Sequence, residues 1–311
     1  MARYFAPPDG YQPGLVFHLR ERQEGGGLRS DVRQEPLRDP FTRSEVIVLV
    51  HGFNNHYGEA SVAYHGFRLR QYEHGGPQFI PPALEGLLAD LFWPGDAGWW
   101  GLFDRGDFLV YPAAVSTARD AAPRLARHLR SMPTLRTVHF IAHSLGCRIV
   151  LETIDDLRQH GGPTVGKVCL MAAAVPVFEV QSGGNLSAAM EYAKEMRILY
   201  SDDDAVLRYA FPPGQTLASG SEGRFPTALG LHGPPPGVAG QIDSIDINDA
   251  GHSDYWGHSQ KKLASDAATK SIADFFRFGL WKRTLTARAP GRAPRTGTAE
   301  PRELGYVRAI R

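Results

Sequence analysis

Short runs of predominantly apolar residues recur along the chain and alternate with segments of helical periodicity. The run at residues 46–50 is mostly β-branched and stops at His51-Gly52. Four further runs have the same character: residues 108–111, 138–142, 168–175 and 198–200. Strands that are apolar on both faces are typical of a parallel sheet that helices cover on each side. The runs therefore predict strands of such a sheet.

Helical periodicity appears between the runs. Ala60, Ala63, Tyr64 and Phe67 recur at the spacing i, i+3, i+4 and i+7, and the segment 147–154 has the same spacing after the run at 138–142. This alternation predicts the α/β class, as a three-layer sandwich with a mostly parallel central sheet. A less regular strand at 242–247 is expected to close the sheet, and residues 14–19 are expected to open it as an antiparallel edge.

Two stretches fit no layer of this sheet. Residues 79–103 are rich in aromatic side chains and are interrupted by Pro81-Pro82 and Pro94-Gly95, and residues 208–241 are dominated by Gly and Pro. Long connections in compact domains are often functional lids. We therefore predict an aromatic-rich insertion, a lid or a plain covering excursion, at 76–106. Residues 208–241 are predicted to be a Gly/Pro-rich loop.

Charge divides the chain more sharply than its formal net charge of +1 suggests. Residues 281–311 hold eight Lys and Arg against two Glu, a balance of +6, which leaves residues 1–280 at −5. We expect the basic segment to be a poorly ordered extension, and the near-neutral total argues against a nucleic-acid partner. The start of the chain lacks a signal-peptide pattern and no apolar run spans a membrane. Two cysteines make no disulfide framework, so a cytoplasmic location is expected.

The sharpest chemical signal is Ala142-His143-Ser144-Leu145-Gly146, between a predicted strand and a predicted helix. A turn this tight crowds the backbone, so small residues are needed two positions before and after its centre. Ser144 is then held exposed at the turn. The N–H of Leu145 lies at a helix N-terminus, where an oxyanion is favoured. The pattern predicts that Ser144 is a nucleophile.

A second motif, His51-Gly52-Phe53-Asn54-Asn55, directly follows the strand at 46–50. Gly52 allows the backbone to turn sharply. An N–H at Phe53 or Asn54 is then a candidate second donor to an oxyanion. We interpret His51 as structural, with an imidazole that bonds the loop backbone.

A serine nucleophile needs a base, and the base needs an acid that orients it. Among the twelve histidines, His252 is our candidate because it follows the last predicted strand and a flexible Ala-Gly pair; His258 is the alternative. Asp204 is the candidate acid, after the strand that ends at residue 200. Because three adjacent carboxylates repel one another when buried, one at most faces inward. Asp202 and Asp203 remain alternatives to Asp204.

The order Ser, Asp, His with an upstream His-Gly loop resembles the α/β-hydrolase superfamily over about residues 45–257. The segments 93–94, 201–207 and 252–256 are similar to a bacterial branch of mostly undetermined substrate. Ala142 departs from the commonest form of the turn, which has Gly there. With the edge strand and the basic extension inferred above, the chain is predicted to divide into a lead-in with an edge strand at 1–44, a catalytic domain of the α/β-hydrolase fold at 45–280, and the extension at 281–311.

The resemblance also implies a mechanism. Ser144 attacks a carboxylic ester, His252 relays its proton, Asp204 holds the imidazole, and Leu145 and Phe53 N–H groups stabilise the oxyanion. No metal or organic cofactor is required. The implied substrate is a small-molecule ester, and the aromatic stretch favours an apolar acyl group. The implied enzyme is a serine hydrolase similar to carboxylesterases and lipases.

Other functions fit parts of the same pattern. Acyltransferases and thioesterases use the same three residues, and a binding protein can keep the fold without activity. A metal hydrolase is disfavoured because the spacing of His51, His56 and His65 does not match H-E-x-x-H. Cys147 and Cys169 are expected to be buried apolar groups rather than reactive thiols.

Overall fold

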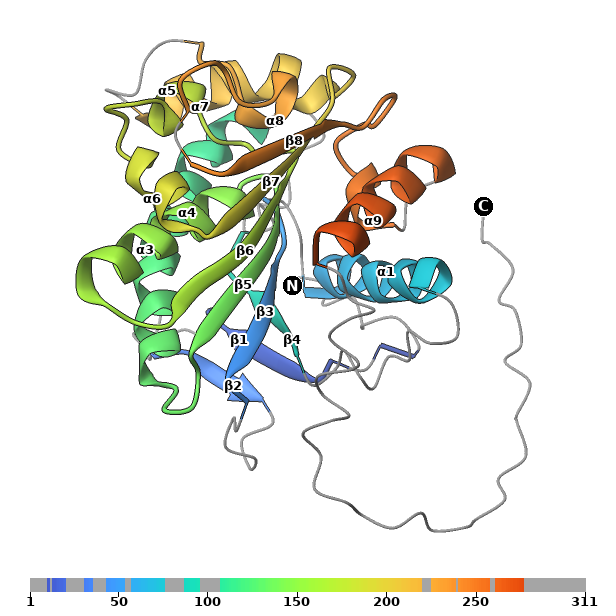
Figure 1. Ribbon diagram of the computed structural model, residues 1–311. Helices are drawn as coiled ribbons and strands as arrows, with labels where there is room; N and C mark the ends of the chain where they lie inside the picture. Colours follow the sequence, from blue (N-terminus) through green and yellow to red (C-terminus); the bar gives the residue numbers. More distant parts are fainter. Residues whose placement is uncertain are drawn as a thin grey trace, which may run out of the picture.

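The computed structural model describes residues 10–11, 13–20, 31–35, 43–53, 57–75, 87–95, 107–219, 225–238, 240–257 and 261–276. Within them an eight-stranded sheet runs in the order β2-β1-β4-β3-β5-β6-β7-β8 (Figure 1). The strands are β1 Leu15–His18, β2 Arg33–Glu35, β3 Glu45–Val50, β4 Leu88–Phe92, β5 Thr137–His143, β6 Thr164–Met171, β7 Glu195–Tyr200 and β8 Ile242–Asp246. Only the pairing of β1 with β2 is antiparallel among these strands.

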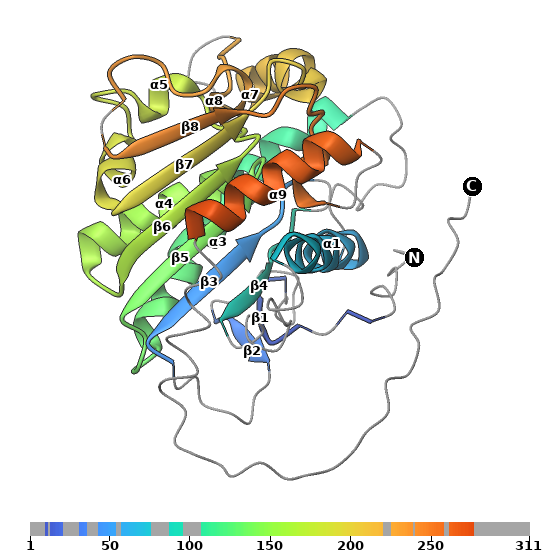
Figure 2. The same ribbon diagram turned by 45° about the vertical axis from the view of Figure 1, so that its right-hand side comes forward.

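Helices cover both faces of the sheet, as Figures 1 and 2 show. Helices α1 (Tyr57–Gly75) and α9 (Lys262–Phe276) lie on one face, and α3 (Asp107–Ser131) and α4 (Gly146–His160) lie on the other. The shorter elements are α5 Val177–Val180, α6 Ser187–Tyr192, the π-helix η1 Val206–Ala210, α7 Phe211–Ser219, α8 Leu229–His232 and the 3₁₀ helix η2 Asp254–Trp256. The predicted three-layer α/β sandwich is confirmed.

The apolar run of β3 explains this two-sided burial. Val46, Val48 and Val50 contact the core beneath α3 and α4. Ile47 and Leu49 contact the core beneath α1 and α9. Because side chains alternate between the faces of a strand, an unbroken apolar run supplies both cores at once.

Two strand predictions were wrong. Residues 108–111 lie in α3 rather than in a strand, since a run of four apolar residues does not distinguish a strand from a buried helical turn. Residues 14–19 contain β1, which is not an antiparallel edge: it pairs in parallel with β4 and antiparallel with β2, and β2 forms the edge. The closing strand expected at 242–247 is present as β8.

The two stretches that fitted no layer also need correction. β4, at Leu88–Phe92, is an inner strand of the sheet inside the predicted aromatic insertion. Asp90 in its centre hides the strand from an apolar pattern, and Arg68 of α1 pairs with that carboxylate at 2.8 Å. The predicted loop at 208–241 contains α7 and α8 and the end of η1. Residues 76–86, 96–106 and 277–311, with most of the predicted lid and the basic extension, lie outside the described residues.

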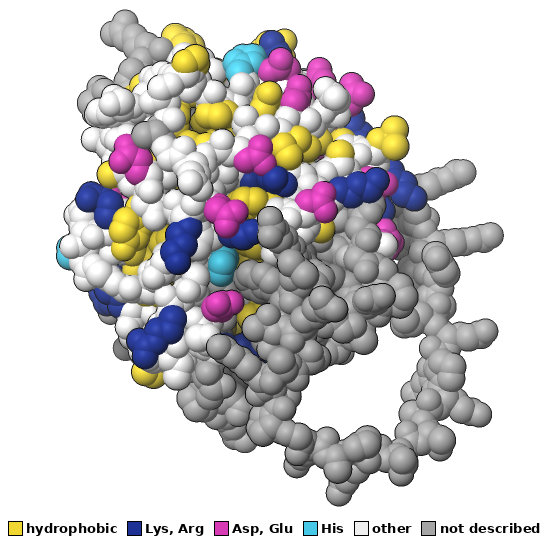
Figure 3. Space-filling model, in the orientation of Figure 1, with side chains coloured by type: hydrophobic (Ala, Val, Ile, Leu, Met, Phe, Trp, Pro, Cys, Tyr) yellow, Lys and Arg dark blue, Asp and Glu magenta, His cyan; other side chains and the backbone are white. Residues whose placement is uncertain are grey.

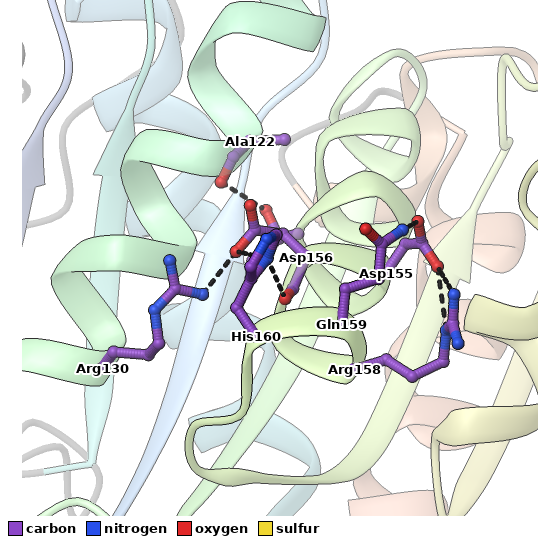
Figure 4. A network of polar contacts seen from close by, with 8 residues as sticks. Ala122, Arg130, Asp155, Asp156, Arg158, Gln159 and His160 are labelled. Carbon is purple, nitrogen blue, oxygen red and sulfur yellow. Dashed lines mark hydrogen bonds and ion pairs between the residues drawn. The ribbon is translucent and has the colours of Figure 1, made fainter.

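Helix α4, which carries the turn after β5, is fixed along its length to α3. Thr153 Oγ1 donates to the carbonyl oxygen of Ala122 at 3.3 Å, and Arg130 pairs with Asp156 near the end of the helix (Figure 4). These two contacts attach the middle and the last turns of α4 to α3. No helix in the described ranges is both long and apolar enough to cross a membrane.

Candidate active site

Ser144 occupies a sharp turn between β5 and α4. Its backbone has a φ of 54°, a left-handed value that is uncommon for a residue with a side chain. Two hydrogen bonds hold it there: Ser144 N–H donates to the carbonyl oxygen of Met171 at 3.0 Å, and Ala174 N–H donates to that of Ser144 at 3.2 Å. The neighbouring strand β6 thus stabilises the strained turn.

The small residues of the motif are explained by close backbone approach. A Cβ at Gly146 would overlap the carbonyl oxygen of His51 and lie 2.9 Å from that of Val50. Ala142 is fully buried and pairs with Val50 of β3 and Leu170 of β6 in the sheet. The end of β3 and the start of the loop after it therefore lie directly against the start of α4, which explains why the motif has a small residue at position 146.

Three side chains that are far apart in the sequence form one chain of hydrogen bonds. Ser144 Oγ lies 2.8 Å from His252 Nε2, and His252 Nδ1 lies 2.8 Å from Asp204 Oδ2. The carboxylate accepts hydrogen bonds only, so Nδ1 carries the proton and Nε2 is free to accept one from the serine hydroxyl. The structure therefore brings together the three residues predicted from the sequence.

Asp204 differs from its neighbours in burial and in contacts. Its side chain is fully buried, and its Oδ1 accepts a hydrogen bond of 3.0 Å from Leu207 N–H. The side chain of Asp202 is 60% exposed and bonds His232 at 2.6 Å. Asp203 accepts a hydrogen bond from Asp249 N–H. Within the described residues, neither Asp202 nor Asp203 forms a hydrogen bond or ion pair with His252, and His258 lies outside them.

Sheet topology explains why these residues meet. β5, β7 and β8 run in parallel, so the segments that follow them emerge at one edge of the sheet (Figure 1). The loop with His252 is also attached to α9, because Ser265 Oγ donates to the carbonyl oxygen of Asp254 at 2.6 Å. Asp254 Oδ2 in turn accepts from Gly251 N–H at 2.7 Å, which closes the turn around His252.

The loop after β3 lies against Ser144. A Cβ at Gly52 would lie 2.8 Å from Ser144 Cβ, so only glycine allows this approach. Phe53 follows and is partly buried. Leu145 is fully buried, and its N–H has no acceptor in the described part of the chain. The N–H of Leu145 is therefore available to a ligand beside Ser144 Oγ.

His51 has the contacts of a structural residue. Its Nδ1–H donates to the carbonyl oxygen of Gly52 at 2.8 Å, and its own carbonyl oxygen accepts from Trp93 Nε1–H at 2.8 Å. Burial, and then the charge of Arg20, hold the pKa of His51 well below its usual value. The imidazole is consequently neutral and fixes the loop backbone, in line with the interpretation from the sequence.

Sequence reasoning missed Tyr64, which it read only as an apolar helix position. Its buried hydroxyl accepts from His51 N–H at 2.9 Å and lies 2.6 Å from the carbonyl oxygen of Leu91. It thereby ties the ends of β3 and β4 together below the loop. The sequence signal for this role of Tyr64 is weak, because a tyrosine on an apolar helix face is usually a core residue.

The described residues contain neither an exposed cysteine nor a cluster of metal-binding side chains. Cys147 and Cys169 are fully buried, as expected. Burial raises the pKa of Cys147 well above its usual value and that of Cys169 to about 12. No group of three or more His, Cys, Asp or Glu in the described ranges is arranged to hold a metal ion.

The comparisons with known proteins identify the family. A family model described as "Alpha/beta hydrolase of unknown function (DUF900)" matches residues 31–211. The match covers more than half of the chain, which therefore belongs to this α/β-hydrolase family. A search of the curated proteins found no match.

Solved structures of hydrolases are similar at low sequence identity. The ferulic acid-bound Est1E from Butyrivibrio proteoclasticus shares 11% identity, with 78% of this chain and 93% of that chain covered and a TM-score of 0.40. The esterase from Pyrobaculum calidifontis shares 13%, covering 78% and 77%, with a TM-score of 0.43. The NocB thioesterase domain shares 15%, covering 76% and 96%, with a TM-score of 0.42. Such scores carry no information on substrate.

Proposed function

We propose that the protein is a serine hydrolase that cleaves a carboxylic ester through an acyl-enzyme. The observation that supports this most directly is the continuous hydrogen-bond chain from Ser144 Oγ through the His252 imidazole to the buried carboxylate of Asp204. A serine hydroxyl is a weak nucleophile, and an adjacent base that removes its proton activates it. His252 Nε2, 2.8 Å from Ser144 Oγ, is placed to act as such a base.

The reaction proceeds in two halves. Ser144 Oγ attacks the ester carbonyl while its proton moves to His252 Nε2. The bond to the alcohol then breaks, and Nε2–H protonates the leaving oxygen. Water attacks the acyl-enzyme in the same manner, loses its proton to Nε2, and releases the acid as the proton returns to Ser144 Oγ.

Asp204 stabilises the imidazolium that forms in each half-reaction. Its Oδ2 accepts from Nδ1–H, which selects the tautomer with Nε2 free. Full burial removes competition by water for the carboxylate. The bond from Leu207 N–H fixes the orientation of the carboxyl group.

The negative charge on the substrate oxygen needs donors placed in advance. Leu145 N–H, at the beginning of α4, is one donor, and the helix dipole adds to its effect. Phe53 N–H is the proposed second donor, because Gly52 brings its loop against Ser144. Together these groups favour the tetrahedral intermediate over the ground-state carbonyl.

Steady-state hydrolysis of p-nitrophenyl esters of two to twelve carbons tests the activity and the preference for an apolar acyl group. We expect turnover in the wild type that Ser144→Ala abolishes. Ser131→Ala, an exposed position at the far end of α3, serves as the matched control. Parallel assays with acyl thioesters, and with an added alcohol as acyl acceptor, distinguish an esterase from a thioesterase or an acyltransferase. Absence of turnover on every acyl donor would contradict the proposal.

A further inference from the structure

His143 precedes the nucleophile, and the mechanism above gives it no role. Its side chain is only 5% exposed. Its Nε2 lies 2.6 Å from the backbone carbonyl oxygen of His252, a residue 109 positions away. A carbonyl oxygen accepts hydrogen bonds only, so Nε2 carries a proton and donates it. The last residue of β5 is thus bonded directly to the backbone of the candidate base.

The ring of His143 also packs against the segment that follows that base. Its centroid lies 4.9 Å from that of His252 and 6.1 Å from those of both Tyr255 and Trp256. On its other side, a Cβ at Gly52 would lie 3.0 Å from His143 Nδ1. The imidazole therefore fills the space between the loop after β3 and the loop after β8.

His252 can act as the base only if its backbone is held in place. The bonds of His252 to Ser144 and Asp204 run through its side chain, and they form only when the backbone already places the ring correctly. The bond from Gly251 N–H to Asp254 Oδ2 closes this turn on itself and does not attach it to β5. The attachment of Asp254 to α9 fixes the loop two residues further on, relative to a helix rather than to the nucleophile.

We propose that His143 is a positioning residue of the hydrolase site. Its Nε2–H holds the His252 carbonyl, so that the base keeps its distance from Ser144 Oγ as the proton moves back and forth. This inference rests on the proposed serine-hydrolase function. A misplacement of about 1 Å in a reacting group is enough to cost about 100-fold in rate.

Two amide variants separate the hydrogen bond from simple packing. The side-chain nitrogen of Gln extends about as far as Nε2 of histidine, whereas that of Asn ends near the position of Nδ1. His143→Gln therefore retains a donor to the His252 carbonyl, and His143→Asn loses it with similar chemistry. The readout is inactivation by a reporter-bearing ethoxy fluorophosphonate, which measures the reactivity of Ser144 without a known substrate.

We expect His143→Asn to lower the limiting rate of inactivation about 10- to 100-fold, with the half-saturating probe concentration changed less than about twofold. His143→Gln is expected within about threefold of the wild-type rate. The midpoints of urea unfolding of the two variants, compared with each other, show whether lost rate merely follows lost stability. Equal rates for Asn and Gln, or a loss proportional to destabilisation, would overturn the positioning role.

A measurement on the unsubstituted protein applies even where both variants fail to fold. Long-range ¹H–¹⁵N correlation spectra of histidine-labelled protein report the tautomer of each neutral ring. We expect His143 as the Nε2–H tautomer and His252 as the Nδ1–H tautomer at neutral pH. An Nδ1–H tautomer at His143 would refute the inference while leaving the proposed function intact. A wild type that does not react with the fluorophosphonate would instead refute the function, and the inference with it.

Discussion

Asp204 and His252 are joined by a hydrogen bond of 2.8 Å between Oδ2 and Nδ1, and the carboxylate that accepts it is fully buried. The acidic turn at 202–204 thus separates into one inward residue and two that bond elsewhere. Within the described residues, Asp204 is the one of the three carboxylates that is bonded to the candidate base. Asp202 is paired instead with His232 on the protein surface.

Replacement of Asp204 by Asn is expected to reduce kcat about 10⁴-fold. The amide nitrogen of Asn donates a hydrogen bond, so it favours the tautomer of His252 that cannot accept the serine proton. Asp202→Asn and Asp203→Asn are matched controls and are expected to keep turnover within about threefold of wild type. Ester hydrolysis by the three variants at one pH tests the assignment. If Asp202→Asn or Asp203→Asn lost more turnover than Asp204→Asn, that residue would be the acid instead.

The close approach at Gly146 makes a second prediction. Gly146→Ala is expected to destabilise the protein by about 1–3 kcal/mol, because the added methyl group meets the backbone of His51 and Val50, which cannot yield as a flexible side chain would. Activity is expected to fall as well, since the loop with Phe53 is pushed away from Ser144. Urea unfolding and ester hydrolysis are the two measurements.

Gly161→Ala is the control for that experiment. Gly161 has a φ of +75° and nothing within 4 Å of an added Cβ, so its substitution measures backbone strain without a clash. Its ψ of 172° completes a conformation that is almost exclusive to glycine, so we expect a loss of about 1–3 kcal/mol in stability and unchanged turnover. If Gly146→Ala kept full activity, this prediction would be contradicted, because activity would then not depend on the close contact between the loop after β3 and the start of α4.

The regions that the sequence predicts well are those whose signal is local. β3 is recognisable because all of Val46–Val50 is apolar, and the Ser144 turn because its small residues stand at fixed offsets. β4 is not recognisable from the sequence, because Asp90 interrupts its apolar run and Arg68, the partner of Asp90, lies 22 positions away. The bond from His143 to His252 has no sequence signal at all, since it exists only once β5 and the loop after β8 have come together.

Acid is expected to destabilise the fold through His139. Burial, with smaller effects from Lys167 and Lys194, lowers the pKa of His139 from 6.5 to about 4, and its Nδ1 accepts a hydrogen bond of 2.9 Å from Lys167 N–H. Between pH 6.5 and 4 the unfolded chain takes up this proton and the folded protein does not. Stability therefore falls as the pH falls through this window, by at most about 1.4 kcal/mol per pH unit for this group.

Urea unfolding from pH 7 to 4.5 measures this effect. His139→Asn keeps an acceptor for Lys167 N–H but has no titrating ring, so its stability is expected to depend less steeply on pH than that of the wild type. His160→Asn, at an exposed end of α4, is the surface control for the substitution itself. Parallel curves for wild type and His139→Asn would contradict the assignment.

The buried pair of Arg68 and Asp90 yields a stability prediction. Asp90 is fully buried, Arg68 is 8% exposed, and Tyr11 Oη donates to Asp90 Oδ2 at 2.5 Å. Asp90→Asn leaves a buried guanidinium without its counter-charge and is expected to cost about 3–5 kcal/mol in urea unfolding. Glu73→Gln removes one of the two carboxylate partners of Arg70, Asp266 being the other, and is expected to cost less than about 1 kcal/mol. Equal costs would show that Asp90 adds no more than a surface charge.

The measurement that bears most directly on the proposed serine hydrolase is the site of covalent modification by an alkyl fluorophosphonate. Ser144 Oγ is expected to form a bond to phosphorus and expel fluoride, with His252 taking the serine proton. Intact-mass and peptide analysis should then find one adduct, on Ser144, in the wild type and none in Ser144→Ala. An unmodified wild type, or an equal adduct in both proteins, would contradict the assignment of Ser144 as the nucleophile.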